Sequence, residues 1–270
     1  MTLDKRMELR QAVGLVTPGA SVALGGVTLY RRPMAFTLAL MRRFAEDSVP
    51  GELTLLPFTG GLETDLLISA GMVRQVRACY VGLETFGLAP HFTQQANQGT
   101  LDIVEETEAS LACGIRAALS GVGFMPSTAW IGTDLPALRP DVRTVLDPYS
   151  GEELTAFPAI HCDVAVVHAL EADHRGNALL NGHWGVDREV VLVSKTVIVT
   201  AERIVDRLAR ADIPGPAVSA VVEAPGGAYP TSCHPVYPFD GRAILRYVET
   251  AGTEAFPALV AEWCAHHHLP

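Results

Sequence analysis

Charged side chains are scarce in this sequence, since Asp, Glu, Lys and Arg make up only 19% of its 270 residues. Hydrophobic residues account for 49%, so the chain can bury a large core and is not a disordered polar chain. Acidic residues outnumber basic ones, and the net charge of -10 disfavours nucleic acid or an anionic membrane surface as a partner. No apolar run reaches the length of a bilayer, and no secretory signal is recognised. We therefore expect a cytoplasmic protein that does not associate with membranes.

The sequence also lacks linkers, repeats and metal-binding patterns. No stretch rich in Pro, Gly and Ser divides the chain, so we expect a single domain over residues 1–270. The 5 cysteines are scattered without metal-ligand spacing and are interpreted as reduced core thiols. The 9 histidines show no pattern except the run from His266 to His268 near the C-terminus, and we expect no metal site.

The sequence does contain an alternation of short apolar runs with helical patterns. This alternation is typical of an α/β fold with a mainly parallel sheet flanked by helices. The expected strands are residues 21–24, 53–56, 76–81, 163–170, 189–193 and 196–200. The expected helices are residues 33–46, 63–70, 90–98 and 201–210. The region 215–239 is crowded with Pro and Gly, which predicts an ordered excursion over the sheet or over a partner subunit.

A glycine turn, Gly25-Gly26, follows the first expected strand. It carries neither the Gly-x-Gly-x-x-Gly motif of dinucleotide-binding folds nor the Gly-Lys-Ser/Thr of phosphate-binding loops, so both interpretations fail. Because glycine lets the backbone approach a ligand closely, the N–H groups of Gly25 and Gly26 could act as oxyanion donors. Arg31 and Arg32 could bind a substrate carboxylate or phosphate, since a guanidinium group can donate two parallel hydrogen bonds to either anion. The alternative, an ordinary strand-to-helix turn with solvated arginines, stays open.

Several carboxylates precede a helix that has an apolar face. Glu105 and Glu106 suit this place because carboxylates oppose the positive end of the helix dipole, and Thr107 can cap the helix. Glu108 shares a face with Leu111, so we expect its side chain to point toward the packed side, where desolvation would raise its pKa. Glu108 is therefore a candidate catalytic residue.

In combination these segments resemble the α subunit of family I coenzyme A transferases, and the likeness covers nearly the whole chain. Within the family, the sequence is most similar to the glutaconate-type α subunits and to the α subunit of the CoA-ester hydrolases that open the last ring in steroid breakdown. The segments that carry the resemblance are 31–36 after the glycine turn, the Glu108 helix with 123–126, the turn 173–177 and the segment 221–228.

The resemblance implies a parallel sheet flanked by helices, paired with a homologous β subunit in an αβ or α2β2 assembly, with the active site at their junction. It implies a glutamate that attacks an acyl-CoA thioester, forms an acyl-glutamyl anhydride and passes coenzyme A to an acceptor carboxylic acid. This nucleophile must be shielded from water. Coenzyme A is then a substrate, and no tightly bound cofactor is expected.

The resemblance also bears on Glu108. Most transferases of the family carry the glutamate on the β-type half, whereas the ring-opening hydrolases carry it on the α-type half, at the position that matches Glu108. Glu108 is thus the predicted catalytic residue, and transfer, ring-opening hydrolysis and a noncatalytic scaffold role stay open.

Some positions depart from the family or permit two interpretations. Residues 27–30 replace the small and polar residues expected there, so Tyr30 could line a different pocket. The turn 173–177 is interpreted as structural. Glu223 could bind at the subunit junction or anchor a loop. A sugar-phosphate sensor on the same kind of sheet would need a DNA-reading helix-turn-helix, and the first twenty residues are too short for one.

Overall fold

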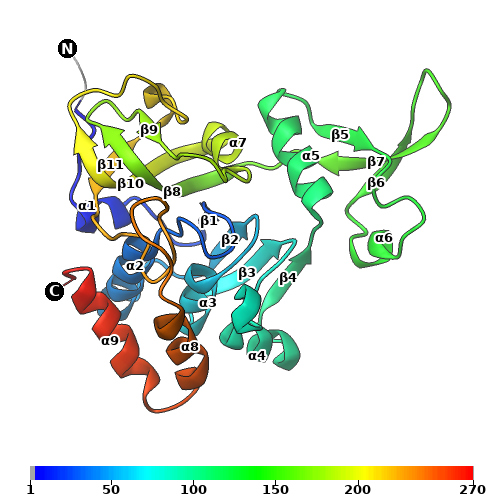
Figure 1. Ribbon diagram of the computed structural model, residues 1–270. Helices are drawn as coiled ribbons and strands as arrows, with labels where there is room; N and C mark the ends of the chain where they lie inside the picture. The colour runs from blue at the N-terminus through cyan, green and yellow to red at the C-terminus, as the bar shows by residue number, and fades with distance from the viewer. Residues whose placement is uncertain (1–3, 270) are drawn as a thin grey trace.

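The computed structural model describes residues 4–269, and within them a large sheet dominates the fold (Figure 1). Its strands run in the order β11-β10-β8-β1-β2-β3-β4 and pair in parallel, with β9 antiparallel to β8. The strands are β1 (Ser21–Leu24), β2 (Leu53–Pro57), β3 (Val73–Ala78), β4 (Asp102–Glu105), β8 (Cys162–Asp173), β9 (Ala178–Leu179), β10 (Ser194–Val205) and β11 (Ala220–Glu223). The expected α/β fold with a mainly parallel sheet is confirmed.

Helices cover both faces of this sheet. Successive side chains of a strand point to opposite faces, so Val22 and Leu24 pack with one group of helices and Ala23 with another. The first face carries α1 (Leu9–Val13), α2 (Met34–Asp47) and α3 (Leu62–Ser69). The second carries α5 (Glu108–Leu119) and α7 (Asp187–Leu192). Outside α2 and α3 lie α8 (Gly241–Thr250) and α9 (Phe256–His266), while α4 (Pro90–Gln98) contacts α3.

A small second sheet projects from α5, away from the main sheet (Figure 1). We call residues 122–159 the arm. It consists of β5 (Phe124–Ser127), α6 (Leu135–Leu138), β6 (Arg143–Leu146) and β7 (Glu153–Pro158), with the antiparallel strand order β5-β7-β6. Trp130, Val142 and Phe157 form its small core, and Cys113 of α5 packs against them. The arm therefore rests on the helix that begins at Glu108.

Two expected elements in the second half of the chain are wrong. Residues 189–193, expected as a strand, belong mostly to α7. Residues 201–210, expected as a helix, begin inside β10, which continues to Val205 in register with β8 as far as Asp173. Pairing along a long central strand overrides local helix preference. The expected strand 76–81 is shifted to Val73–Ala78, and β11 within 215–239 was missed.

The remaining part of 215–239 is ordered and folds back on the chain itself. The Gly227 carbonyl accepts a hydrogen bond of 2.9 Å from the Ala35 N–H, and the Ser232 carbonyl accepts one of 2.7 Å from the Arg31 N–H. These contacts hold the segment over the start of α2, so the expected ordered excursion is confirmed. Among residues 4–269, no helix has both the length and the apolar character that a membrane span requires.

Candidate active site

The loops that follow β1, β2, β3 and β4 gather at one edge of the main sheet, because parallel strands end on the same side. In open α/β sheets this carboxyl edge is where ligands bind. The Gly60 N–H donates to the Tyr80 carbonyl at 2.7 Å, and the Thr28 N–H donates to the Thr59 hydroxyl at 3.1 Å. The candidate site is built from these loops, residues 25–32, 58–61, 79–82 and 106–108.

The glycine turn is tight and internally bonded. Gly26 has a φ of +88°, and a Cβ there would lie 2.5 Å from the Tyr30 carbonyl oxygen, so a larger residue does not fit. The Gly25 N–H donates to the Val166 carbonyl at 2.9 Å, and the Gly26 N–H donates to Asp187 Oδ1 at 3.0 Å. Both predicted oxyanion donors thus have partners within the chain, and a ligand that uses them must displace these partners.

Arg31 is fully buried under this turn. Its guanidinium group donates to the His168 carbonyl at 2.8 Å, to the His183 carbonyl at 3.1 Å and to Asp187 Oδ2 at 2.9 Å. Arg32 is also fully buried. Its Nε donates to the Thr28 carbonyl at 2.7 Å and lies 3.3 Å from Glu63 Oε2.

The interpretation of the two arginines as solvated surface residues is therefore wrong. Burial lowers the pKa of Arg32, and the nearby Glu63 carboxylate opposes that shift. A charge this deeply buried must be paired and hydrogen-bonded. In the chain as described, the arginines support the glycine turn from beneath, and their proposed contact with a substrate stays a prediction.

Tyr30 lies where the glycine turn meets two other segments. Its hydroxyl donates to the His234 carbonyl at 3.2 Å, and its ring meets the His183 ring edge-on at 5.4 Å. The Arg31 guanidinium lies 5.0 Å from the centre of the same ring. Burial raises the pKa of the phenol, so Tyr30 stays neutral and can donate a hydrogen bond near the edge of the site.

Glu108 is the first residue of α5, and the helix start is fixed by its cap. The Thr107 hydroxyl accepts from the Ser110 N–H at 3.1 Å, and the Ser110 hydroxyl accepts from the Thr107 N–H at 2.8 Å. The expectation that Glu108 faces the packed side is wrong, since its side chain is exposed. The helix start projects beyond the core of the sheet, so nothing in the described part of this chain covers it.

Glu108 lies at the carboxyl edge of the sheet, because it comes three residues after β4 ends. The Glu106 N–H donates to the Ala78 carbonyl at 3.2 Å, so the start of α5 lies next to the end of β3. The Cys79 thiol, just after β3, donates to the carbonyl of the residue that follows β2 at 2.8 Å. Burial, reinforced by the negative charge of Glu108, raises the pKa of Cys79 to about 11.

Glu106 is the buried carboxylate that the sequence interpretation missed. It accepts hydrogen bonds from Arg77 Nε at 2.6 Å and from an Arg139 guanidinium nitrogen at 2.8 Å, and it also binds the Ser110 hydroxyl. Helical periodicity applies only from Thr107 onward, whereas Glu106 lies just after β4. The only sequence feature that could have indicated a buried Glu106 is its position directly before the capping residue Thr107. An exposed carboxylate that interacts with the helix dipole would occupy the same position, so the feature does not distinguish the two.

One group of described residues has donor atoms close enough to hold a metal ion, namely His168, Glu202 and Cys233, whose ligand atoms lie within 4.8 Å of one another. The His168 nitrogens bind Thr200 at 2.9 Å and Glu202 at 2.8 Å. Glu202 also accepts from Tyr237 and from the Gly226 N–H. Burial raises the pKa of Cys233 to about 12, so its thiol is neutral in the chain as described. The group acts as a hydrogen-bonded support for the segment after β11.

Two further predicted residues have structural roles. Asp173 Oδ1 accepts from the N–H groups of Arg175 and Asn177 at 3.0 and 3.1 Å, which confirms the structural interpretation of that turn. The Glu223 carboxylate accepts from the Ile204 N–H at 3.2 Å and so ties β11 to β10.

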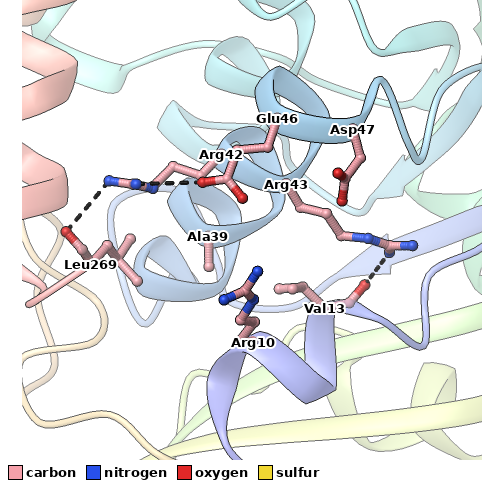
Figure 2. Close-up of a pocket in the computed structure, with 8 residues that line it drawn as sticks. All are labelled: Arg10, Val13, Ala39, Arg42, Arg43, Glu46, Asp47 and Leu269. Atoms are coloured by element: carbon pink, nitrogen blue, oxygen red, sulfur yellow. Dashed lines mark hydrogen bonds and ion pairs between the residues drawn. The ribbon is translucent and has the colours of Figure 1, made fainter.

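Figure 2 shows a cavity of about 170 Å³ that is separate from the candidate site. It lies at the C-terminal end of α2, whereas the glycine turn leads into the N-terminal end. Arg43 there donates to the Val13 carbonyl at 2.7 Å, and Arg42 lies 3.5 Å from both Glu46 and the Leu269 carbonyl. The guanidinium groups of Arg42 and Arg43 thus hold the C-terminal segment and α1 against α2.

Comparison with known proteins identifies the family of this chain. The family model described as coenzyme A transferase matches residues 6–224, a range that contains every loop of the candidate site. The chain belongs to this family. As a coenzyme A transferase family member it is of the α type, in agreement with the resemblance in its sequence motifs.

Relatives of this coenzyme A transferase chain differ in their named reactions. The chain is 35% identical over 266 residues to the α-type chain of the 3-oxoadipate CoA-transferase of Pseudomonas knackmussii, covering 95% of this chain and 92% of that relative. It is 32% identical over 268 residues to the cholesterol ring-cleaving hydrolase IpdA subunit of Mycobacterium tuberculosis, covering 93% and 89%. The solved glutaconate coenzyme A-transferase from Acidaminococcus fermentans superimposes with a TM-score of 0.86 at 28% identity, covering 96% of this chain and 88% of that one.

Proposed function

We propose that this transferase moves coenzyme A between an acyl-CoA and a carboxylic acid, with Glu108 as nucleophile in a site that a homologous β subunit completes. The observation that carries the proposal is the position of Glu108. It lies at the carboxyl edge of the sheet, on the first turn of α5 and exposed in the isolated chain. Its carboxylate oxygens supply the nucleophile that this chemistry requires.

The reaction follows from a carboxylate that attacks a thioester. Glu108 oxygen bonds to the acyl carbonyl carbon, the carbon–sulfur bond breaks, and coenzyme A leaves as a thiolate. The thiolate then attacks the glutamyl carbonyl carbon of the anhydride, which releases the first carboxylic acid and leaves coenzyme A on Glu108 as a thioester. An acceptor carboxylate repeats the two steps in reverse and leaves as the new acyl-CoA. Atoms and charge balance without a metal ion or a redox cofactor, and coenzyme A is a substrate.

A partner subunit is part of the proposal because the anhydride hydrolyses unless water is excluded. An exposed Glu108 does not meet this condition alone. The Tyr80 side chain, in the loop after β3 that forms part of the site, is also exposed, at 40%. Coverage by a β subunit, in an αβ or α2β2 assembly, would bury Glu108 and Tyr80 and exclude water from the site.

A second candidate is hydrolytic ring opening of a CoA ester, with Glu108 as general base or nucleophile. The observation that favours it is the 32% identity with the cholesterol ring-cleaving hydrolase IpdA subunit. A third is a scaffold role in which the partner supplies the nucleophile. For all three we propose a cytoplasmic location, since the 5 cysteines are free.

The deciding experiment uses the chain co-expressed with its β-type partner. Acyl-CoA consumption is measured with and without an acceptor acid in the wild type, in Glu108→Ala and in the control Glu105→Gln, which alters the neighbouring exposed carboxylate. Transfer through Glu108 requires turnover that depends on the acceptor and is lost only in Glu108→Ala. Acceptor-independent turnover that is lost in Glu108→Ala indicates the hydrolase.

Mass spectrometry gives a second readout in the same samples. Incubation with acyl-CoA alone should add the mass of coenzyme A less one water to a peptide of this chain that contains Glu108, because a glutamate oxygen leaves with the first acid. The wild type but not Glu108→Ala should show this change. The modification on the partner instead, with turnover retained in Glu108→Ala, would assign the scaffold role to this chain.

A further inference from the structure

The arm contacts the segment that carries Glu108 through a specific hydrogen bond. The Trp130 indole Nε1–H donates to the Thr107 hydroxyl oxygen at 2.9 Å. Thr107 is the N-cap residue of α5, and the same oxygen accepts from the Ser110 N–H at 3.1 Å. The cap that starts the helix at Glu108 is thus shared between the helix and the arm.

Arg139 makes a second contact from the arm to the same segment. One guanidinium nitrogen donates to the Glu105 carbonyl and to the Glu106 carboxylate, both at 2.8 Å. From the other side, Arg77 of β3 binds Glu106 at 2.6 Å. The residues directly before Glu108 are therefore held between the main sheet and the arm.

Trp130 and Arg139 are themselves fixed by the arm. The Trp130 ring packs edge-on against Phe157 at 5.0 Å, and Val142 completes this small core. The Arg139 guanidinium lies 6.0 Å from the Trp130 ring centre. Two buried side chains that support each other can transmit the position of the arm to the helix start.

Glu108 depends on this support because of what surrounds it. Among residues 4–269, no side chain or N–H group donates a hydrogen bond to its carboxylate, so the carboxylate follows its backbone. We propose that Trp130 and Arg139 are positioning residues, which place the Glu108 carboxylate by fixing residues 105–107. This inference rests on the proposed function of Glu108. A displacement of about 1 Å in a reacting group is enough to lower a rate substantially.

The test compares Trp130→Phe with Trp263→Phe in the assembled enzyme. Trp130→Phe keeps an aromatic ring against Phe157 but removes the N–H that binds Thr107. Trp263 lies in α9, away from the arm (Figure 1), and its buried indole N–H has no partner among residues 4–269, so the same substitution removes no hydrogen bond within them. We expect kcat to fall about tenfold in Trp130→Phe with KM unchanged, and to be unchanged in Trp263→Phe.

A second pair of variants keeps the test decisive if Trp130→Phe does not fold. Arg139→Gln removes the contact with Glu106, whereas Asp141→Asn weakens only the exposed side of Arg139, where Asp141 binds it at 2.8 Å. The first should lower kcat and the second should not. Thr107→Ser keeps the accepting oxygen and should retain wild-type kcat, whereas Thr107→Val should behave like Trp130→Phe.

Glu108→Ala separates the two hypotheses. If Glu108→Ala abolishes turnover and Trp130→Phe and Arg139→Gln keep wild-type kcat, the positioning role is overturned while the proposed function stands. If Glu108→Ala keeps turnover, the proposed function fails and the positioning role fails with it. In the Glu108→Ala background, Trp130→Phe should cause no further loss of residual turnover, whereas a general structural defect would add to it.

Discussion

The buried guanidinium group of Arg31 and the carboxylate of Asp187 form an ion pair of 2.9 Å, with side-chain exposures of 0% and 3%. Asp187 begins α7 and also accepts the Gly26 N–H at 3.0 Å. One carboxylate therefore fastens both ends of the glycine turn to a helix that lies far along the chain. The charge of Arg31 is thereby paired, and the Gly26 N–H group has a hydrogen-bond acceptor.

Asp187→Ala should destabilise the fold by about 3–5 kcal/mol, because it leaves Arg31 buried without its partner charge. The control Glu262→Ala breaks the exposed pair of Arg246 and Glu262 and should cost less than about 1 kcal/mol. Urea unfolding of both variants measures the loss in free energy of unfolding. Equal losses in the two variants would show that water reaches Arg31 and solvates its charge.

Gly114→Ala should destabilise the fold by about 1–3 kcal/mol through overpacking. A Cβ at Gly114 would lie 2.5 Å from Ile160 Cδ1 and 2.8 Å from the Pro158 carbonyl oxygen, where α5 meets the end of the arm. Gly123→Ala is the control, because a Cβ there has no heavy atom within 4 Å. Thermal unfolding should separate the variants, and a Gly114→Ala melting temperature equal to that of Gly123→Ala would contradict the close packing.

Stability should decrease as the pH falls from about 6.5 to about 4, because burial lowers the pKa of His267 from 6.5 to about 4. In this window the unfolded chain binds a proton that the folded chain does not, so the free energy of unfolding falls by up to about 3 kcal/mol. Burial also lowers the pKa of His168, which acts in the same direction. His267→Asn should flatten the dependence measured by urea unfolding, whereas His161→Gln, at an exposed site, should leave it unchanged.

Glu108→Gln should make Cys79 more reactive, because removal of the negative charge eases formation of the thiolate. Alkylation of Cys79, followed by peptide mass spectrometry at about pH 8, should be roughly two- to threefold faster in the variant. Glu105→Gln should alkylate at the wild-type rate. An unchanged rate in Glu108→Gln would place its carboxylate away from β3.

Local periodicity predicted the first half of the sheet well. The expected strand 21–24 and helix 90–98 coincide with β1 and α4, since short apolar runs bounded by turns have few other ways to bury themselves. The same rule failed at 189–193, where a short apolar run forms α7, because periodicity does not separate a buried strand from a buried helix of similar length. The expected single domain stays a prediction, and the arm was not foreseen.

The fold class, the family and the order of the motifs can be predicted from the amino-acid sequence, because they depend on local patterns of apolar residues, glycines and capping groups. Which charged side chains are buried becomes known only when the folded chain is seen. The tertiary structure buries Arg31, Arg32 and Glu106 and leaves Glu108 exposed. Burial depends on which distant segments cover a residue, as Asp187 covers Arg31 and the arm covers Glu106. The spacing of residues along the chain does not indicate such contacts.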